Sequence, residues 1–194
     1  NQPTETNAEN QSAYVSANMG GTNLEVAENF TNINSNVEKI VVYGLYAINQ
    51  NDQWNNVEPG GSLNFNVRFY EPIDNAPDWN NPVHEFLNVQ TTSITAETPW
   101  DSGFNVWRFE LDIPSTAIDD GWVSVQSAGG DGWFLWHNSS AGDNISSRID
   151  HNNKVGLDSP NHPSYIGKGF ENKNEPLNDD MAMQFWGTGD DLEM

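Results

Sequence analysis

Two stretches of the sequence alternate apolar and polar side chains with a period of two, and this pattern limits the chain to strands. Residues 63–71 read LNFNVRFYE, and residues 104–114 read FNVWRFELDIP. Successive side chains of a strand point to opposite faces, so each stretch presents one apolar face. Since no run longer than two turns repeats apolar residues at helical spacing, the sequence predicts an all-β fold.

Seven further strands are expected between turns rich in Gly, Pro, Asn and Asp. Residues 39–48 (KIVVYGLYAI) are apolar at almost every position, which is typical of a central strand covered on both faces. Two sheets that pack face to face bury alternating residues economically. We therefore predict an antiparallel two-sheet β-sandwich of jelly-roll type. The remaining strands are expected at residues 13–17, 23–30, 82–94, 121–127, 132–138 and 180–187.

The stretch GGDGWFLWHN combines a glycine–aspartate turn with three large aromatic side chains. The strands expected on either side of the turn 128–131 predict a hairpin. Alternation places Trp133 and Trp136 on opposite faces, so at least one of them is expected in the core. The outward tryptophan and His137 are left as candidate ligand contacts.

The length of 194 residues suits one domain with a sizeable core. Residues 1–12 are polar and rich in Asn, so we expect a disordered leader or linker there. Residues 13–190 are expected to form a single β-sandwich domain. The chain begins without Met and without an apolar signal-like run, which favours a monomeric module taken from a larger chain.

The charge and composition exclude several classes of partner. The chain carries 28 acidic against 7 basic residues, a formal net charge of −21. Nucleic-acid binding needs clustered Lys and Arg, so we expect no nucleic-acid partner. No run of roughly 18 apolar residues is present, so no membrane insertion is expected. The absence of cysteine excludes disulfides, thiolate zinc sites and cysteine nucleophiles.

No segment carries a complete catalytic motif. Glu110 and Asp112 in ELDIP faintly resemble the E-x-D-x-x-E strand of laminarinase-type sandwich hydrolases, but the second glutamate is missing. Residues 164–170 (SYIGKGF) invite comparison with the Tyr–Lys strand of jelly-roll alginate lyases, but the spacing differs. The four histidines lack zinc-binding spacing and are expected in loops or at strand surfaces. We therefore expect a protein without enzymatic activity.

Three long connections are expected, at 49–62, 72–82 and 139–178, and tryptophan–asparagine motifs lie in the first two. A tryptophan ring can stack on a sugar ring while neighbouring Asn and Asp side chains bond the hydroxyls. The alternative is that each tryptophan folds back over the edge of the core. The candidate carbohydrate-binding residues are Trp54, Asn55, Asn56, Trp79, Asn80, Asn81, Trp100 and Asp101.

Calcium is a candidate cofactor because acidic and amide side chains cluster in the turns 118–121, 129–132, 141–144 and 178–180. Calcium takes six to eight oxygen ligands from Asp, Asn and backbone carbonyls. Asp179 and Asp180, just before the last expected strand, are the best candidates for metal ligands. The alternative is that these residues only form turns.

The order of motifs resembles a recurrent module of secreted, multi-domain bacterial surface proteins. It is carried by VEKIVVYGLY, FNVRFYE, VWRFELDIP, GWVSVQSAGGDGWFLWHNSSAGD and NDDMAMQFWG, over residues 37–187. Members of that module resemble jelly-roll carbohydrate-binding modules. The resemblance implies a secreted or cell-surface location. This sequence departs from the module in the insertion 145–177 and in the two Trp–Asn loops.

These observations favour a non-catalytic extracellular glycan-binding or adhesion module, with polysaccharide or another glycan as its partner. The alternatives are a structural or protein-interaction module of a bacterial surface protein, and a glycan-active hydrolase or lyase. Grouping of Trp54, Trp79 and Trp100 on one exposed face would favour the first. Burial of all three would favour the second. A pocket holding two carboxylates, or Tyr with His and Arg, would favour an enzyme.

Overall fold

All regular structure in the described part of the chain is β-structure, which confirms the all-β prediction. The computed structural model describes residues 12–19, 21–50, 53–97, 99, 103–151, 174–177 and 179–187. The leader predicted at 1–12 therefore lies, except for Ser12, outside the described residues. No helix in these ranges is long and apolar enough to cross a membrane.

Thirteen strands are present in these ranges, and they include every strand expected from the sequence. Their bounds are β1 Ala13–Val15, β2 Ala17–Met19, β3 Thr22–Phe30, β4 Val37–Gln50, β5 Gln53–Asn56, β6 Asn64–Ile73, β7 Ala76–Ala96, β8 Val106–Thr116, β9 Gly121–Ala128, β10 Trp133–His137, β11 Ser146–Asp150, β12 Asn174–Leu177 and β13 Met183–Trp186.

The strands form one curled sheet whose main order is β1-β10-β4-β8-β7-β6-β9-β2-β3-β11-β12, with β5 and β13 added on β4. The 21-residue strand β7 turns the sheet, because its first part pairs with β6 and its last part with β8. Strand β2 pairs with β9 in parallel, and the other pairings are antiparallel. The sheet is therefore mixed, which corrects the purely antiparallel prediction.

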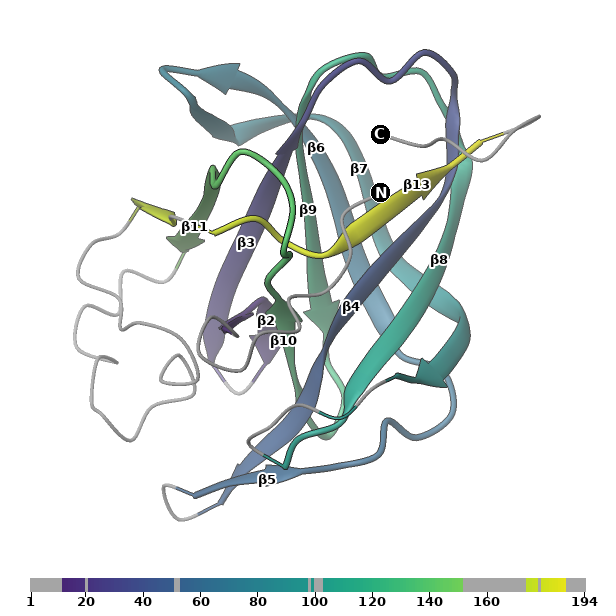
Figure 1. Cartoon of the computed structure of the whole chain (residues 1–194), viewed down its shortest axis with the longest axis vertical. Helices are drawn as coiled ribbons and strands as arrows, with labels where there is room; N and C mark the ends of the chain where they lie inside the picture. Colours follow the sequence, from purple (N-terminus) through teal and green to yellow (C-terminus); the bar gives the residue numbers. More distant parts are fainter. Residues whose placement is uncertain are drawn as a thin grey trace.

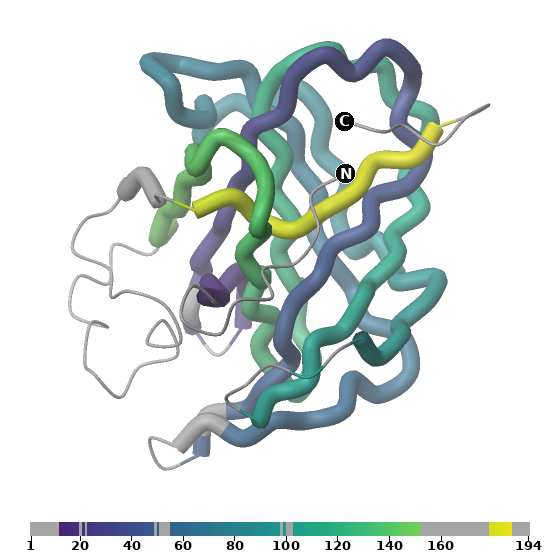
Figure 2. Tube along the Cα trace, in the orientation of Figure 1, coloured from purple at the N-terminus to yellow at the C-terminus, as the bar shows by residue number. Residues whose placement is uncertain are grey.

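Aromatic side chains fill the space that the curled sheet encloses. In Figures 1 and 2, β4, β8 and β13 cross in front of β6, β7 and β9. Phe65 of β6 meets Phe109 of β8 with ring centroids 5.6 Å apart, and Phe69 of β6 meets Phe185 of β13 at 6.3 Å. These rings, together with Phe134 of β10, belong to one buried cluster. The inward faces predicted for 63–71 and 104–114 are thus confirmed.

The predicted hairpin between 121–127 and 132–138 is wrong. Strand β9 pairs with β6, β3 and β2, whereas β10 pairs with β1 and β4. The intervening glycines adopt positive φ values, 78° at Gly129 and 105° at Gly130, and the chain passes between two parts of the curled sheet. Trp136 lies in the core as expected, but His137 is fully buried, so it is not a surface ligand contact.

The connection expected at 72–82 is also corrected, since it is a tight hairpin within β6 and β7. Pro72 pairs with Pro77, and only Asp74 and Asn75 form the turn. Both adopt left-handed φ values, 52° and 61°, as a two-residue turn between twisted strands requires. The connection expected at 49–62 contains β5, and the connection expected at 139–178 contains β11 and β12.

Candidate functional site

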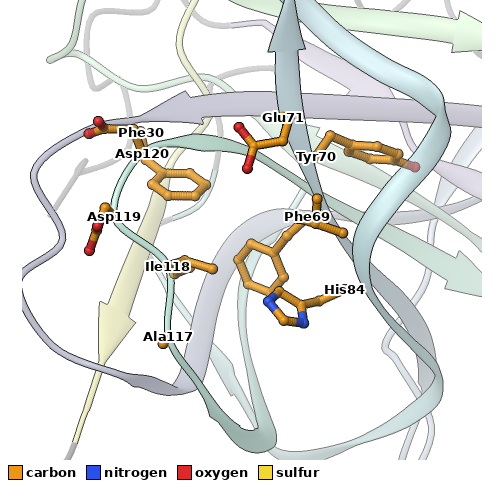
Figure 3. A pocket seen from close by; sticks show the side chains of 10 residues that line it. Phe30, Phe69, Tyr70, Glu71, His84, Ala117, Ile118, Asp119 and Asp120 are labelled. Carbon is orange, nitrogen blue, oxygen red and sulfur yellow. The ribbon is translucent and has the colours of Figure 1, made fainter.

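Two cavities, each of about 390 Å³, share the side chain of Tyr70 in their linings. The first has an apolar floor of Phe30, Phe69 and Ile118 and an acidic rim of Glu71, Asp119 and Asp120. Figure 3 shows the ring of His84 beside Phe69 at its base, with ring centroids 6.3 Å apart. This cavity opens directly onto the aromatic core. The second cavity is polar, and it is where functional groups converge.

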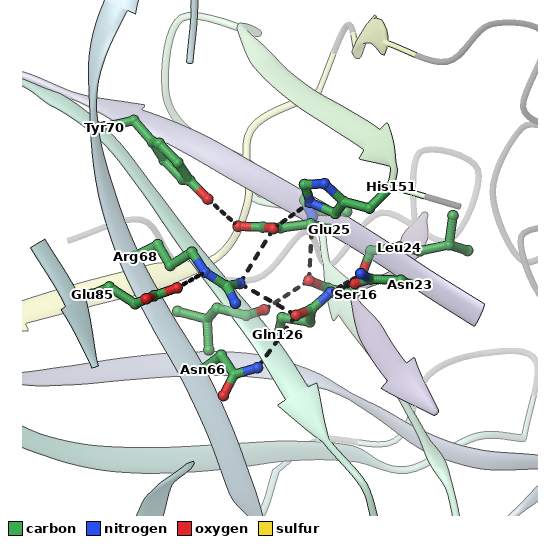
Figure 4. Close-up of polar contacts among 12 residues, drawn as sticks. Ser16, Asn23, Leu24, Glu25, Asn66, Arg68, Tyr70, Glu85, Gln126 and His151 are labelled. Carbon is green, nitrogen blue, oxygen red and sulfur yellow. Dashed lines mark hydrogen bonds and ion pairs between the residues drawn. The ribbon is translucent and has the colours of Figure 1, made fainter. Parts of the chain in front are cut away.

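A buried carboxylate, Glu25 of β3, lines the second cavity. Only 1% of its surface is exposed, so the charge must be matched by hydrogen-bond donors. Tyr70 donates its hydroxyl to Oε1 at 2.6 Å, and Nε2 of His151 lies 2.7 Å from Oε2. Nη1 of Arg68 lies 3.3 Å from the same Oε2. Figure 4 shows the three side chains converging on Glu25.

Arg68 extends this network to a second carboxylate. Its Nε donates to Oε1 of Glu85 at 2.7 Å, across the β6–β7 pair. Its Nη1 also reaches Oε1 of Gln126 at 3.3 Å, and Gln126 donates to Oδ1 of Asn23 at 2.9 Å. Polar side chains from the four strands β3, β6, β7 and β9 are therefore linked into one hydrogen-bonded network, drawn in Figure 4.

The network shifts the pKa values of Glu25 and Tyr70 in opposite directions. Burial by itself raises the pKa of Glu25, but the donors His151, Arg68 and Tyr70 outweigh burial and hold that pKa below its ordinary value. Burial, together with the negative charge of Glu25, raises the pKa of Tyr70 far above its ordinary value. Glu25 is therefore an anion at neutral pH, and the Tyr70 hydroxyl keeps its proton.

The cavity also brings in one of the two Trp–Asn motifs predicted from the sequence. Trp79 and Asn80, near the start of β7, line it together with Pro82. The Trp79 ring packs edge-on against Tyr70 at 5.4 Å and against His151 at 6.3 Å. With 8% of its surface exposed, Trp79 forms a wall of the cavity. Asn81 is exposed and donates to Asp78 at 2.9 Å.

Among the described residues, the candidates of the first Trp–Asn motif lie away from this cavity. Trp54, Asn55 and Asn56 belong to β5, which pairs with β4. Figure 1 places β5 and the β6–β7 turn at opposite ends of the molecule. Trp100 and Asp101 lie outside the described residues. The two Trp–Asn motifs therefore do not form one common platform.

The two predicted calcium ligands have different partners in the structure. Asp180 accepts backbone N–H groups from the loop 143–145, at 3.1, 2.8 and 3.3 Å in chain order. Asp179 accepts the hydroxyls of Ser12, at 3.1 Å, and Tyr14. Among the described residues, no group of three or more Asp, Glu or His side chains is arranged to hold a metal ion. Both carboxylates thus fix loops and strand ends here.

The main polar residues of the cavity were not proposed as a site from the sequence. Arg68 and Tyr70 are two residues apart in the stretch 63–71, on the side opposite its apolar face, and this spacing is the one signal that the sequence offers. Glu25 lies in the strand expected at 23–30, and His151 lies 126 residues further along the chain. No local spacing connects these two residues, so only the fold reveals the cluster.

Comparisons with known proteins leave this geometry as the sole basis for assigning a function. No family model, no curated protein and no solved structure matches the chain. The resemblance to carbohydrate-binding modules therefore has no support beyond the sequence motifs themselves.

Proposed function

We propose that the protein is a glycan-binding module whose ligand enters the cavity formed by Asn23, Glu25, Arg68, Trp79, Asn80 and His151, named here the Glu25 cleft. One observation supports this proposal most directly. Trp79 and Asn80, singled out from the sequence as sugar-binding types, line an open cavity with many hydrogen-bonding groups. Ligand sites commonly combine an aromatic wall with a few convergent polar groups.

The cleft suits a polyhydroxylated ligand because its inner groups are held rigidly while its outer groups are accessible. Glu25 is held by three donors and forms the fixed base. The side chain of Glu85 is 41% exposed and that of His151 is 28% exposed, and Asn80 is also exposed. These outer groups offer both donors and acceptors for sugar hydroxyls. Little side-chain order is lost on binding to such a prearranged surface.

The test is affinity electrophoresis of Asn80→Ala and His151→Ala proteins through gels containing single neutral polysaccharides. Both variants are expected to lose the retardation shown by the unchanged protein. The control is Asn55→Ala, because Asn55 is also exposed but lies on β5 at the opposite end of the molecule. Near-ultraviolet circular dichroism should show that all three variants keep their packing. Equal retardation of all four proteins would contradict the proposed location.

A second candidate function is supported by one specific arrangement: Tyr70, His151 and Arg68 meet in a pocket that also holds two carboxylates. A carboxylate bound to a histidine orients the ring for proton transfer in many enzymes. The second candidate is therefore a glycan-active enzyme with His151 as the general base, oriented by Glu25. Release of reducing ends or unsaturated sugars from a polysaccharide, abolished by His151→Asn, would favour this candidate over simple binding.

The proposal retains three finer features from the sequence: a two-sheet jelly-roll arrangement, a secreted or cell-surface location, and calcium that stabilises loops.

Calcium binding has a direct test. If Asp179 and Asp180 bind calcium, chelation by EDTA should lower the melting temperature, and added calcium should restore it. If no glycan binds in any gel, a structural or protein-interaction role becomes the better reading.

A further inference from the structure

We propose that the Glu25 cleft selects sugars by charge and takes those with a protonated amine in preference to uronic acids. This inference rests on the proposed function and deepens it. Its basis is the charge balance of the side chains that line the cavity. Two of them, Glu25 and Glu85, are carboxylates, and Arg68 is the one arginine or lysine among the described lining residues.

Two of the three guanidinium nitrogens of Arg68 contact the protein's own carboxylates. Its Nε is 2.7 Å from Glu85, and its Nη1 is 3.3 Å from Glu25. A guanidinium recognises an external carboxylate best when its planar fork is open. Here the positive charge of Arg68 is already paired with two internal anions, so a uronate carboxylate would bind beside them and gain little from it.

The imidazole of His151, which also lines the cleft, contacts the same anion. Nε2 of His151 contacts Oε2 of Glu25, the oxygen that also faces Arg68. Lys39 and Arg108 pair with Glu110 on β8, away from the cleft. A bound uronate would therefore meet two fixed carboxylates within a chain of formal charge −21, with no unpaired cation among the described lining residues.

The ammonium group of an amino sugar, in contrast, would be attracted by the carboxylates of the cleft. The Glu85 side chain is 41% exposed, so it can accept a hydrogen bond from the ligand while keeping its contact with Arg68. The negative field of the whole molecule also raises the local concentration of cations. Charge selectivity of this kind weakens as salt is added, because exposed charges are screened.

The test is isothermal titration calorimetry at pH 6 with β-1,4-linked oligomers of glucosamine, glucose and glucuronic acid, matched in length. At low salt, the glucosamine oligomer is expected to bind about two- to fivefold more tightly than the glucose oligomer, the range typical of one exposed charge pair. The glucuronic acid oligomer is expected to bind most weakly. High salt should bring the three affinities together.

Glu85→Gln removes the exposed carboxylate and loosens Arg68, so it should abolish the preference for the amine and improve binding of the glucuronic acid oligomer. Asp112→Asn is the matched control, because it changes the net charge equally on the exposed face of β8. If the glucuronic acid oligomer binds as tightly as the others, or if the control behaves like Glu85→Gln, the charge inference is overturned while the glycan site stands. If none of the three oligomers binds, the proposed function itself fails.

Discussion

The carboxylate of Glu25 lies 2.7 Å from Nε2 of His151, although 126 residues separate them in the chain. Glu25 belongs to β3, and His151 follows directly after β11, which pairs with β3. The backbone N–H of His151 also donates to the carbonyl of Asn23 at 3.0 Å. Side-chain and backbone contacts together fix the end of β11 against β3, and this position builds one wall of the cleft.

Loss of the Glu25 charge should destabilise the fold strongly. Glu25→Gln removes the buried anion that Arg68, Tyr70 and His151 contact, and disrupting a buried ion pair such as Arg68–Glu25 costs about 3 kcal/mol. We expect a decrease of that size in the free energy of unfolding, measured with urea. Glu85→Gln alters an exposed pair on the same arginine and should cost less than about 1 kcal/mol. Equal losses in the two variants would contradict the central role of Glu25.

The Glu25 carboxylate should make the free energy of unfolding depend on pH in the acidic range. The pKa of Glu25 is lower in the folded protein than its ordinary value of 4.5. A lowered pKa means that the unfolded chain binds the proton more tightly. The stabilisation from Glu25 is therefore fully present above pH 4.5 and is lost as the pH falls through the folded-state pKa. The stability difference between the unchanged protein and Glu25→Gln should shrink below pH 4.5, and a constant difference would count against this assignment.

The strands were predictable because their signal is local. Alternation within 63–71 and 104–114 identified β6 and β8, together with the face of each that enters the core. Pairing between strands depends on side chains far apart in the chain, so the partners of β9 and β10 were predicted wrongly. The Asp74–Asn75 turn was missed because asparagine and aspartate accept left-handed φ values without the glycine that usually marks such a turn.

The candidate site was harder to predict than the strands. The sequence indicates Trp79 and Asn80 as candidate sugar-binding residues, because their Trp–Asn motif stands out. Their partners in the cavity come from two other strands, β3 and β6, and from the residue after β11, and nothing in the local sequence connects them. The matching motif at Trp54 has the same letters but lies on β5, so composition alone does not indicate which copy borders the Glu25 cleft.

Asp180 should anchor the loop 143–145 whether or not a metal is present. Its carboxylate accepts three consecutive backbone N–H groups, and charged hydrogen bonds of this kind contribute about 2 kcal/mol. Asp180→Ala should lower the free energy of unfolding by about that amount, and hydrogen exchange should speed up at the amides of 143–145. Asp180→Asn keeps one acceptor oxygen and should lose less. Unchanged exchange in the alanine variant would refute the anchoring role.

The last prediction concerns close packing between β4 and β10. A Cβ atom on Gly44 would overlap the Phe134 ring and the carbonyl oxygen of Leu135. Both neighbours are buried on β10, which pairs with β4, so neither can move freely. Gly44→Ala should therefore cost about 3 kcal/mol of unfolding free energy or prevent folding, at the upper end of overpacking penalties. Gly60→Ala is the matched control, because a Cβ there meets no atom within 4 Å. The melting temperature of the control should lie within a few degrees of that of the unchanged protein. A Gly44→Ala protein with the same melting temperature as the control would show that β4 and β10 can separate more easily than their packing implies.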